Sequence, residues 1–243
     1  MPNWQRGMMR AMRITNHPVT VSAIDDFTPW YRRITFSAPD LLADLEFFPT
    51  LWLRIWVEDP SKGGDVSQRG YTLTDVRPQQ GTFALDFVLH EAAGPAGDWA
   101  KSATVGQERE VALTPKRVEL PADTSSLMLV GDVTALPAIN SWVEALGHRL
   151  PIEVALEDSH PDHDDLPRAG GAASWTVLQR SGARGAALAG WLSERKDSAG
   201  LYVWGAGERA LVKTIRPVLK GHLGLDRARQ FTQFYWIEGK GFG

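Results

Sequence analysis

The segment SLMLVGDVTALPAINSWVEALGH, from Ser126 to His148, decides the fold of the second half of the chain. It opens with a short apolar run that ends at a glycine, which is typical of a buried parallel strand, and continues with apolar residues at helical spacing. Further strand-like runs at 151–158, 174–180 and 200–207, and helical stretches at 182–196 and 208–223, continue this alternation. We therefore predict a doubly wound parallel sheet with helices on its faces.

The first half has a different rhythm. Turn signals made of Pro, Gly and Asp separate strand-like runs at 19–25, 31–39, 50–59, 69–76, 82–91 and 108–115. This spacing predicts a six-stranded antiparallel barrel, with one short helix near 94–104. The chain is thus expected to be a β plus α/β protein with an N-terminal domain at 1–120 and a C-terminal domain at 121–243.

Composition excludes several classes of protein. A formal net charge of -3 and a pI near 6.1 argue against binding to nucleic acid or to an anionic membrane. The chain has no cysteine, so redox chemistry would need an organic cofactor. The apolar run at 51–57 is too short to cross a bilayer, and no export signal is evident. We expect a cytoplasmic monomer without a protein-bound metal.

Two glycine-rich strand exits, at 131–134 and 205–208, are candidates for one ligand crevice, because ligands of open α/β sheets bind outside the carboxyl ends of the strands. Backbone amides at the first exit could meet a cofactor pyrophosphate, with a glycine permitting close approach. Alternatively, the acidic residues only cap helices and the glycines only form turns. The candidate residues are Gly131, Asp132, Thr134, Ala135, Gly205, Ala206, Gly207 and Glu208.

The run RGYTLTDV, at 69–76, places a cation and an aromatic ring two positions apart. On a strand, Arg69 and Tyr71 point to the same face, so they offer a guanidinium for a phosphate and a plane for a flat ring. Taken alone, this pattern is more typical of an exposed cross-strand pair than of a cofactor site.

Four motifs in order resolve that ambiguity: R-x-Y-T at 69–72, H-x-x-x-G-P-A-x-x-W at 90–99, V-G-D-x-T-A-L-P-A at 130–138 and W-x-A-G-E at 204–208. Together they resemble the siderophore-interacting proteins, a branch of the ferredoxin-NADP reductase-like flavoproteins. The ending FYWIEGKG, at 234–241, resembles the aromatic Y-W-x-x-G ending of that family. The resemblance covers nearly the whole chain.

The resemblance implies FAD in the barrel, NADPH or NADH on the α/β domain, and a ferric siderophore as the electron acceptor. It implies that Arg69 contacts the FAD phosphates, that Tyr71 packs on the flavin, and that Thr72 bonds near its reactive nitrogen; Tyr71 and Thr72 are the catalytic candidates. The residues implied to wrap the rest of FAD are His90, Gly94, Pro95, Ala96 and Gly97, with Trp99 either a second stacking surface or a hydrophobic plug. The chain departs from many relatives at Thr74, Glu91 and Gly97, which predicts weaker FAD binding. It also has Val133 where the family has Glu, which removes a carboxylate near the nicotinamide site, and hydride transfer is expected to survive.

The nucleotide preference rests on two strand ends. Arg180, Ser181 and Arg184 could hold a 2′-phosphate, whereas Glu157 and Asp158 could prefer a ribose diol, and we favour NADPH. The cations proposed for an anionic ferric siderophore are Lys116, Arg117 and Lys240. The close pair His160 and His163 is interpreted as part of a hydrated acidic loop.

Two other functions stay open. One is a flavin-linked NAD(P)H oxidoreductase with a quinone, free flavin or carrier protein as acceptor. The other is a siderophore-binding protein without catalysis, which would be colourless. A short-chain dehydrogenase is disfavoured because no Tyr-x-x-x-Lys pair occurs.

Overall fold

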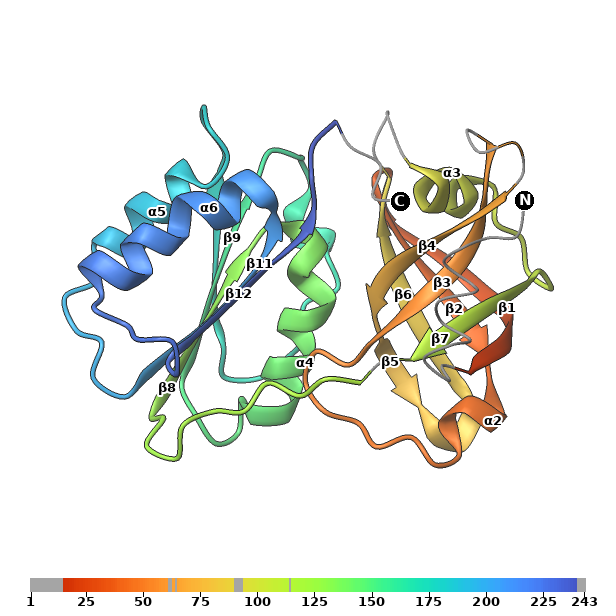
Figure 1. Cartoon of the computed structure of the whole chain (residues 1–243), viewed down its shortest axis with the longest axis horizontal. Helices are drawn as coiled ribbons and strands as arrows, with labels where there is room; N and C mark the ends of the chain where they lie inside the picture. Colours follow the sequence, from red (N-terminus) through yellow and green to blue (C-terminus); the bar gives the residue numbers. More distant parts are fainter. Residues whose placement is uncertain (1–14, 61–62, 64, 90–93, 114, 240–243) are drawn as a thin grey trace. The chain divides into compact units, whose positions relative to one another are not determined.

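The structure is a computed structural model that describes residues 15–60, 63, 65–89, 94–113 and 115–239. The described residues divide into two compact units, one that ends at Arg117 and one that begins at Val118 (Figure 1). None of the helices in the described ranges has the length and apolar character needed to span a bilayer.

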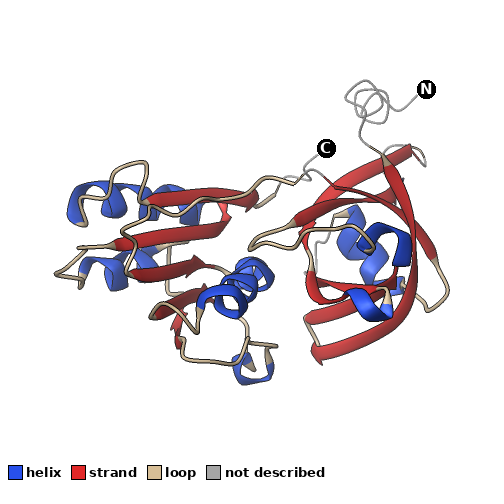
Figure 2. Cartoon of the chain, turned by 90° about the horizontal axis from the view of Figure 1, so that it is seen from below, coloured by secondary structure: helices blue, strands red, loops and turns tan. Residues whose placement is uncertain are grey.

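The first unit is an antiparallel sheet of seven strands in the order β4-β3-β7-β1-β2-β6-β5. Figure 2 shows how strongly this sheet curves. The strands are β1 (Asn16–Thr28), β2 (Tyr31–Ser37), β3 (Trp52–Asp59), β4 (Asp65–Thr72), β5 (Thr74–Arg77), β6 (Thr82–Val88) and β7 (Glu108–Leu113). The helical segments are α2 (Pro39–Leu42), the 3-10 turn η2 (Pro78–Gln80) and α3 (Pro95–Ser102).

The run at 69–76 forms parts of two strands, so the prediction of six strands was wrong by one. β4 ends at Thr72 and β5 begins at Thr74, while Leu73 between them is buried and its N–H donates to the Leu51 carbonyl at 2.9 Å. β4 pairs with β3, and β5 pairs with β6. Among the described residues no strand pairing joins β4 to β5, so closure of the barrel stays a prediction.

Alternating side chains build the core of the first unit. Leu53 and Ile55 of β3 and Phe87 of β6 are at most 1% exposed. The helix α3 adds Ala96 and Trp99 to the same core cluster. The period of two along the strands therefore separates an apolar inner face from a more polar outer face.

The second unit is a parallel sheet of five strands in the order β10-β9-β8-β11-β12, as the alternating pattern predicted for its first four strands. The strands are β8 (Ser126–Gly131), β9 (Ile152–Asp158), β10 (Ser174–Gln179), β11 (Leu201–Glu208) and β12 (Gln230–Trp236). The helical segments are η3 (Val133–Ala135), α4 (Leu136–Leu146), η4 (His163–Asp165), α5 (Ala186–Ser193), α6 (Arg209–Pro217) and the π-helical turn η5 (Val218–His222).

Helices cover both faces of this sheet, with α5 and α6 on one face and α4 on the other (Figure 1). All residues of β11 are buried, which explains its continuous apolar run. The strand order reverses between β8 and β11, so their carboxyl ends form the topological switch point of the sheet. The edge strand β12 was not predicted.

Candidate functional site

Strand register in the first unit sets the direction of the two side chains that opened the R-x-Y-T motif. β3 pairs with β4 so that Leu53 lies opposite Tyr71 and Ile55 opposite Arg69. Directly opposed residues share a face, and both β3 partners are fully buried. The prediction that Arg69 and Tyr71 point to one face is confirmed, and that face is the inner one.

Tyr71 is half-buried beside the aromatic core. Its ring centroid lies 4.4 Å from that of Phe87, at an interplanar angle of 41°. Burial raises the pKa of Tyr71 well above its ordinary value of 10.0, and the charge of Arg69 offsets only part of that rise. The phenol is therefore neutral at physiological pH. The neighbouring Thr72 is 8% exposed and lies opposite Trp52.

Arg69 is a half-buried cation. Its Nη1 donates to the Gln68 carbonyl at 2.7 Å, and the described part of the chain gives it no ion pair with a carboxylate. Burial lowers the pKa of Arg69 from its ordinary value, with partial compensation from Tyr71 and Asp59. A Cβ added to Gly94 would lie 4.0 Å from Nη2 of Arg69. The guanidinium thus lies beside the start of α3.

The start of α3 has no side-chain cap among the residues that the structure describes. Gly94 is the N-cap in an extended conformation, and Pro95 occupies the first turn. The free amides and the helix dipole favour an anion at this position. Gly94 therefore lies next to Arg69, and the contact of Gly94 to Gly97 with FAD stays a prediction. His90 lies outside the described residues.

Trp99 is packed inside the first unit at 8% exposure. Its ring lies 6.3 Å from Phe36 and 5.7 Å from Phe87, and the Arg109 guanidinium lies 4.9 Å from its centroid. Its Nε1 donates to Gln107 Oε1 at 3.2 Å. Of the two interpretations made from the sequence, these contacts favour the hydrophobic plug.

The cations predicted for the siderophore are not brought together by any contact in the described residues. Arg117 pairs with Glu46 Oε1 at 2.5 Å and lies 4.5 Å from the Phe48 ring centroid. Lys116 is exposed, and Lys240 lies outside the described residues. Their role stays a prediction.

In the second unit, glycines allow the central strands to approach one another. Gly131 pairs with Ala206, and a Cβ on Gly131 would lie 2.1 Å from the Ala206 carbonyl oxygen. Gly207 has φ +147°, and a Cβ there would lie 2.7 Å from Asp132 Oδ2. A Cβ on Gly205 would lie 3.0 Å from a Val130 methyl group. These contacts within the chain account for the glycines that the sequence assigned to cofactor approach.

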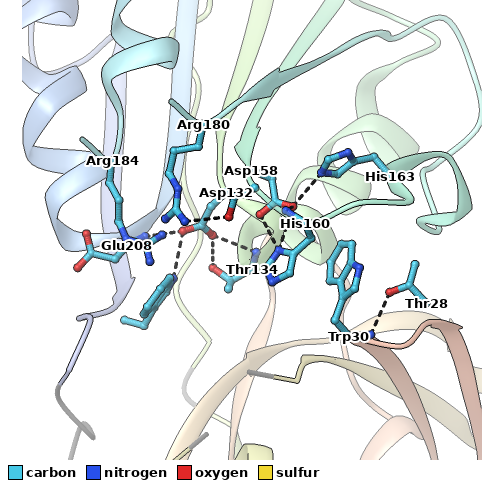
Figure 3. Close-up of polar contacts among 12 residues, drawn as sticks. Thr28, Trp30, Asp132, Thr134, Asp158, His160, His163, Arg180, Arg184 and Glu208 are labelled. Atoms are coloured by element: carbon cyan, nitrogen blue, oxygen red, sulfur yellow. Dashed lines mark hydrogen bonds and ion pairs between the residues drawn. The ribbon is translucent and has the colours of Figure 1, made fainter. Parts of the chain in front are cut away.

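The Asp132 carboxylate accepts hydrogen bonds from several groups at the switch point. Its Oδ1 accepts hydrogen bonds from Thr134 N–H at 3.0 Å and Thr134 Oγ1 at 2.5 Å, and its Oδ2 accepts from Glu208 N–H at 2.7 Å and Trp236 Nε1 at 3.1 Å (Figure 3). Burial raises the pKa of Asp132 above 3.8, and these bonds offset part of the rise. The Thr134 amide, predicted to meet a pyrophosphate, is therefore bonded to a carboxylate of the chain itself.

At the second glycine-rich strand exit, residues 205–208, the Glu208 carboxylate also accepts hydrogen bonds from backbone N–H groups. It is the N-cap of α6 and accepts a hydrogen bond from Ala210 N–H, while its Oε1 accepts one from Glu238 N–H at 3.1 Å. The capping interpretation of Asp132 and Glu208 is confirmed. Ala135 and Ala206, the remaining candidates here, are fully buried.

The predicted 2′-phosphate residues separate into two places. Arg184 donates to both Glu238 oxygens, at 3.1 and 2.6 Å, and its guanidinium lies 4.8 Å from the Trp236 ring. Arg180 instead donates to Ser159 Oγ at 2.8 Å, beyond the end of β9 (Figure 3). Ser181 is exposed.

The two acidic residues considered for a ribose diol have other partners. Glu157 is 2% exposed, and its two oxygens accept the N–H groups of Gly185 at 2.5 Å and Leu188 at 3.0 Å, at the start of α5. Burial and these two bonds favour a helix-capping role for Glu157, and its contact with a ribose stays an untested prediction.

Asp158 binds both histidines of the polar loop, His160 Nδ1 at 2.9 Å and His163 Nε2 at 2.9 Å (Figure 3). Burial alone would raise the pKa of Asp158, but the hydrogen bonds and charge of His160 and the bond of His163 lower it below 3.8. The two histidines are thus tied to the end of β9, while Asp162, Asp164 and Asp165 of the same loop are exposed, as predicted for a hydrated acidic loop.

Sequence reasoning missed Trp236 and Glu238 as members of this site. Trp236 ends the unpredicted strand β12 and Glu238 follows it, and their partners lie 104 and 54 residues away. The aromatic Y-W ending was the one available signal.

Two family descriptions match the chain: Siderophore-interacting FAD-binding domain, at residues 44–117, and Siderophore-interacting protein, at residues 124–239. The siderophore-interacting protein SipS from Aeromonas hydrophila superposes with a TM-score of 0.80 at 25% identity, over 94% of each chain. A ferredoxin NADP+ reductase from Neisseria gonorrhoeae gives a TM-score of 0.68 at 13% identity, over 92% of this chain and 99% of the other, and shows the shared fold.

Among curated proteins, the mycobactin import ATP-binding/permease protein IrtA of Mycolicibacterium smegmatis is 36% identical over 97% of this chain, which spans only 27% of that protein. The ferric vibriobactin reductase ViuB of Vibrio cholerae is 28% identical over 71% of this chain and 65% of its own length. With both family descriptions matched in order along the two units, the chain belongs to the siderophore-interacting protein family.

Proposed function

We propose that this chain is an FAD-dependent reductase that passes electrons from NAD(P)H to a ferric siderophore. The observation that carries the proposal is the half-buried Arg69 guanidinium, which forms no ion pair with a carboxylate of the described residues and lies beside Gly94, the N-cap of α3. Burying a cation is costly unless an anion accompanies it, so this arrangement suits a phosphate group. It lies within the stretch matched to a siderophore-interacting FAD-binding domain.

The residues present fit FAD. Arg69 and the amides of Ala96 and Gly97 would hold its phosphates, and Tyr71, on the same inner face as Arg69, would present a neutral ring to the flavin. Thr72 is proposed to bond near the reactive nitrogen. When bound, FAD would supply the redox chemistry, because a flavin can accept a hydride and release electrons one at a time.

A ferric siderophore is the proposed acceptor because relatives named for ferric vibriobactin and acinetobactin reduction match the chain. Hard oxygen ligands hold Fe(III) better than Fe(II), so reduction releases the metal without protein ligands. Lys116, Arg117 and Lys240 remain the proposed cations for an anionic chelate. The reaction is placed in the cytoplasm, where NAD(P)H is available, and residues 1–120 and 121–243 are assigned to FAD and NAD(P)H respectively.

NADPH is the proposed donor, with Arg180 and Ser181 near its 2′-phosphate. Arg180 lies at the end of β10 and bonds Ser159 after β9, which is the edge where the adenosine ribose lies in doubly wound folds. An arginine suits a phosphate through bidentate hydrogen bonds.

FAD titration of apoprotein tests the site, with Arg69→Met as the variant and Arg54→Met as the matched control. Arg54 lies on the neighbouring strand at the opposite face, 4.5 Å from the Trp52 ring. Loss of a charged hydrogen bond to phosphate is expected to weaken FAD binding by about 10- to 100-fold in Arg69→Met. Arg54→Met should bind within about twofold of the wild type. Equal losses in both variants would contradict the assignment.

A further inference from the structure

The residues Trp236 to Glu238, here called the C-terminal strap, cross the switch point of the second unit. Trp236 Nε1 donates to Asp132, beside the carboxyl end of β8, and Glu238 N–H donates to Glu208, at the end of β11. Both distances are 3.1 Å. The strap is therefore fixed to the two strand ends between which a dinucleotide crosses in doubly wound sheets.

Arg184 holds the strap from the start of α5. Its Nε and Nη2 make a two-point contact with the Glu238 carboxylate, and its guanidinium lies 4.8 Å from the Trp236 ring. The bonds to Glu238, and the nearby charges of Asp132 and Glu208, raise the pKa of Arg184 despite partial burial. Arg184 therefore lies in the electrostatic field of the switch point itself.

The backbone amides at the two helix starts of the switch point already donate hydrogen bonds to carboxylates, so they are poor donors for a pyrophosphate. Asp132 accepts from the Thr134 amide, and Glu208 accepts from the Ala210 amide. A phosphate that approached these amides would meet two carboxylates. Arg184 is a cation at the same place whose present partner is a side chain exposed by 66%.

We propose that Arg184 binds the pyrophosphate of the nicotinamide dinucleotide and that Glu238 competes for the same guanidinium. The proposal deepens the proposed function and rests on dinucleotide binding by the second unit. It separates two roles that the sequence joined: Arg184 acts at the switch point, on the group common to NADH and NADPH, and Arg180 acts at the β9–β10 edge.

The exchange of anions on Arg184 is physically reasonable. The Glu238 contact is a two-point contact, but an exposed ion pair contributes only a little to stability. Compared with the Glu238 carboxylate, a pyrophosphate offers the planar guanidinium of Arg184 more acceptor oxygens and more negative charge. Removal of the Glu238 carboxylate leaves its backbone bond to Glu208 intact, so a side-chain variant weakens the competition without releasing the whole strap.

The test is calorimetric titration of FAD-loaded protein with NADP+ and, separately, with NAD+. Glu238→Ala is compared with the wild type and with Glu153→Ala. Glu153 also forms an ion pair with an arginine, Arg195, but lies near the amino end of β9, away from the switch point. We expect Glu238→Ala to lower the Kd of both nucleotides by about three- to tenfold, and by the same factor, with Glu153→Ala unchanged. Arg184→Met should weaken both nucleotides equally.

Each alternative result overturns a named part of the account. Tightening of NADP+ alone would place Arg184 at the 2′-phosphate and overturn the pyrophosphate assignment. No tightening, or equal tightening in Glu153→Ala, would overturn the competition while leaving the proposed function intact. If neither nucleotide binds to any of these proteins, the proposed function itself fails.

Discussion

Replacement of Glu157 with alanine is expected to destabilise the second unit by about 2–6 kcal/mol, because each buried N–H left without an acceptor costs about 1–3 kcal/mol. The carboxylate is 2% exposed and accepts from the amides of Gly185 and Leu188, so two such groups lose their partner. Urea unfolding, with hydrogen exchange of the α5 amides to assign the change to the second unit, measures the loss. Glu157→Gln, which keeps one acceptor oxygen, should lose about half as much.

The control is Glu153→Ala, on the same strand, where the carboxylate is 42% exposed and pairs with Arg195. Its cost should stay below about 1 kcal/mol. The capping role of Glu157 would be refuted if both alanine variants had equal stability, or if Glu157→Ala changed the ratio of NADPH to NADH affinity while unfolding at the wild-type urea concentration.

Three further perturbations follow from the contacts described above. Asp86→Ala should cost about 3–5 kcal/mol in urea unfolding, because it leaves the mostly buried guanidinium of Arg33 without its bidentate partner; a loss below about 1 kcal/mol would contradict this. Gly131→Ala should lower the melting temperature or prevent folding, because the new Cβ would lie 2.1 Å from the Ala206 carbonyl oxygen, and a wild-type melting curve would show that the strands can separate freely. The raised pKa of Asp132 makes its ionisation cost stability above the folded pKa, and this cost disappears as the pH falls towards 3.8. Asp132→Asn should therefore remove a component of stability that falls with rising pH, as measured by urea unfolding across pH 4–8.

The periodicity of apolar residues along the sequence correctly predicted single strands, helices and the faces on which their side chains lie. The apolar run before Gly131 and the helical spacing after it predicted the β8–α4 unit, and the period of two predicted that Arg69 and Tyr71 share a face. The break at Leu73 was missed because the residues on either side of it, Tyr71, Thr72 and Thr74, favour strands. Leu73 separates β4 from β5 because its side chain is buried in the core of the first unit, and that burial depends on tertiary packing.

Long-range partners were the part that the sequence could not supply. The motif comparison located the Asp132 turn, yet its bond to Trp236 joins residues 104 positions apart. Likewise, Arg180 and Arg184 are four residues apart in the chain, but their partners belong to different places in the sheet. Spacing alone predicted one phosphate site where the structure shows two environments.

The most direct test of the proposed reductase is an anaerobic spectrum of the FAD-loaded protein during sequential additions. NADPH is added first, and a ferric hydroxamate siderophore with a ferrous chelator is added second. The account predicts that the flavin absorbance bleaches with NADPH and recovers as the ferrous complex forms. Bleaching without recovery or ferrous complex would contradict the siderophore as acceptor, and a protein that stays colourless after FAD is supplied would contradict the flavin site at Arg69.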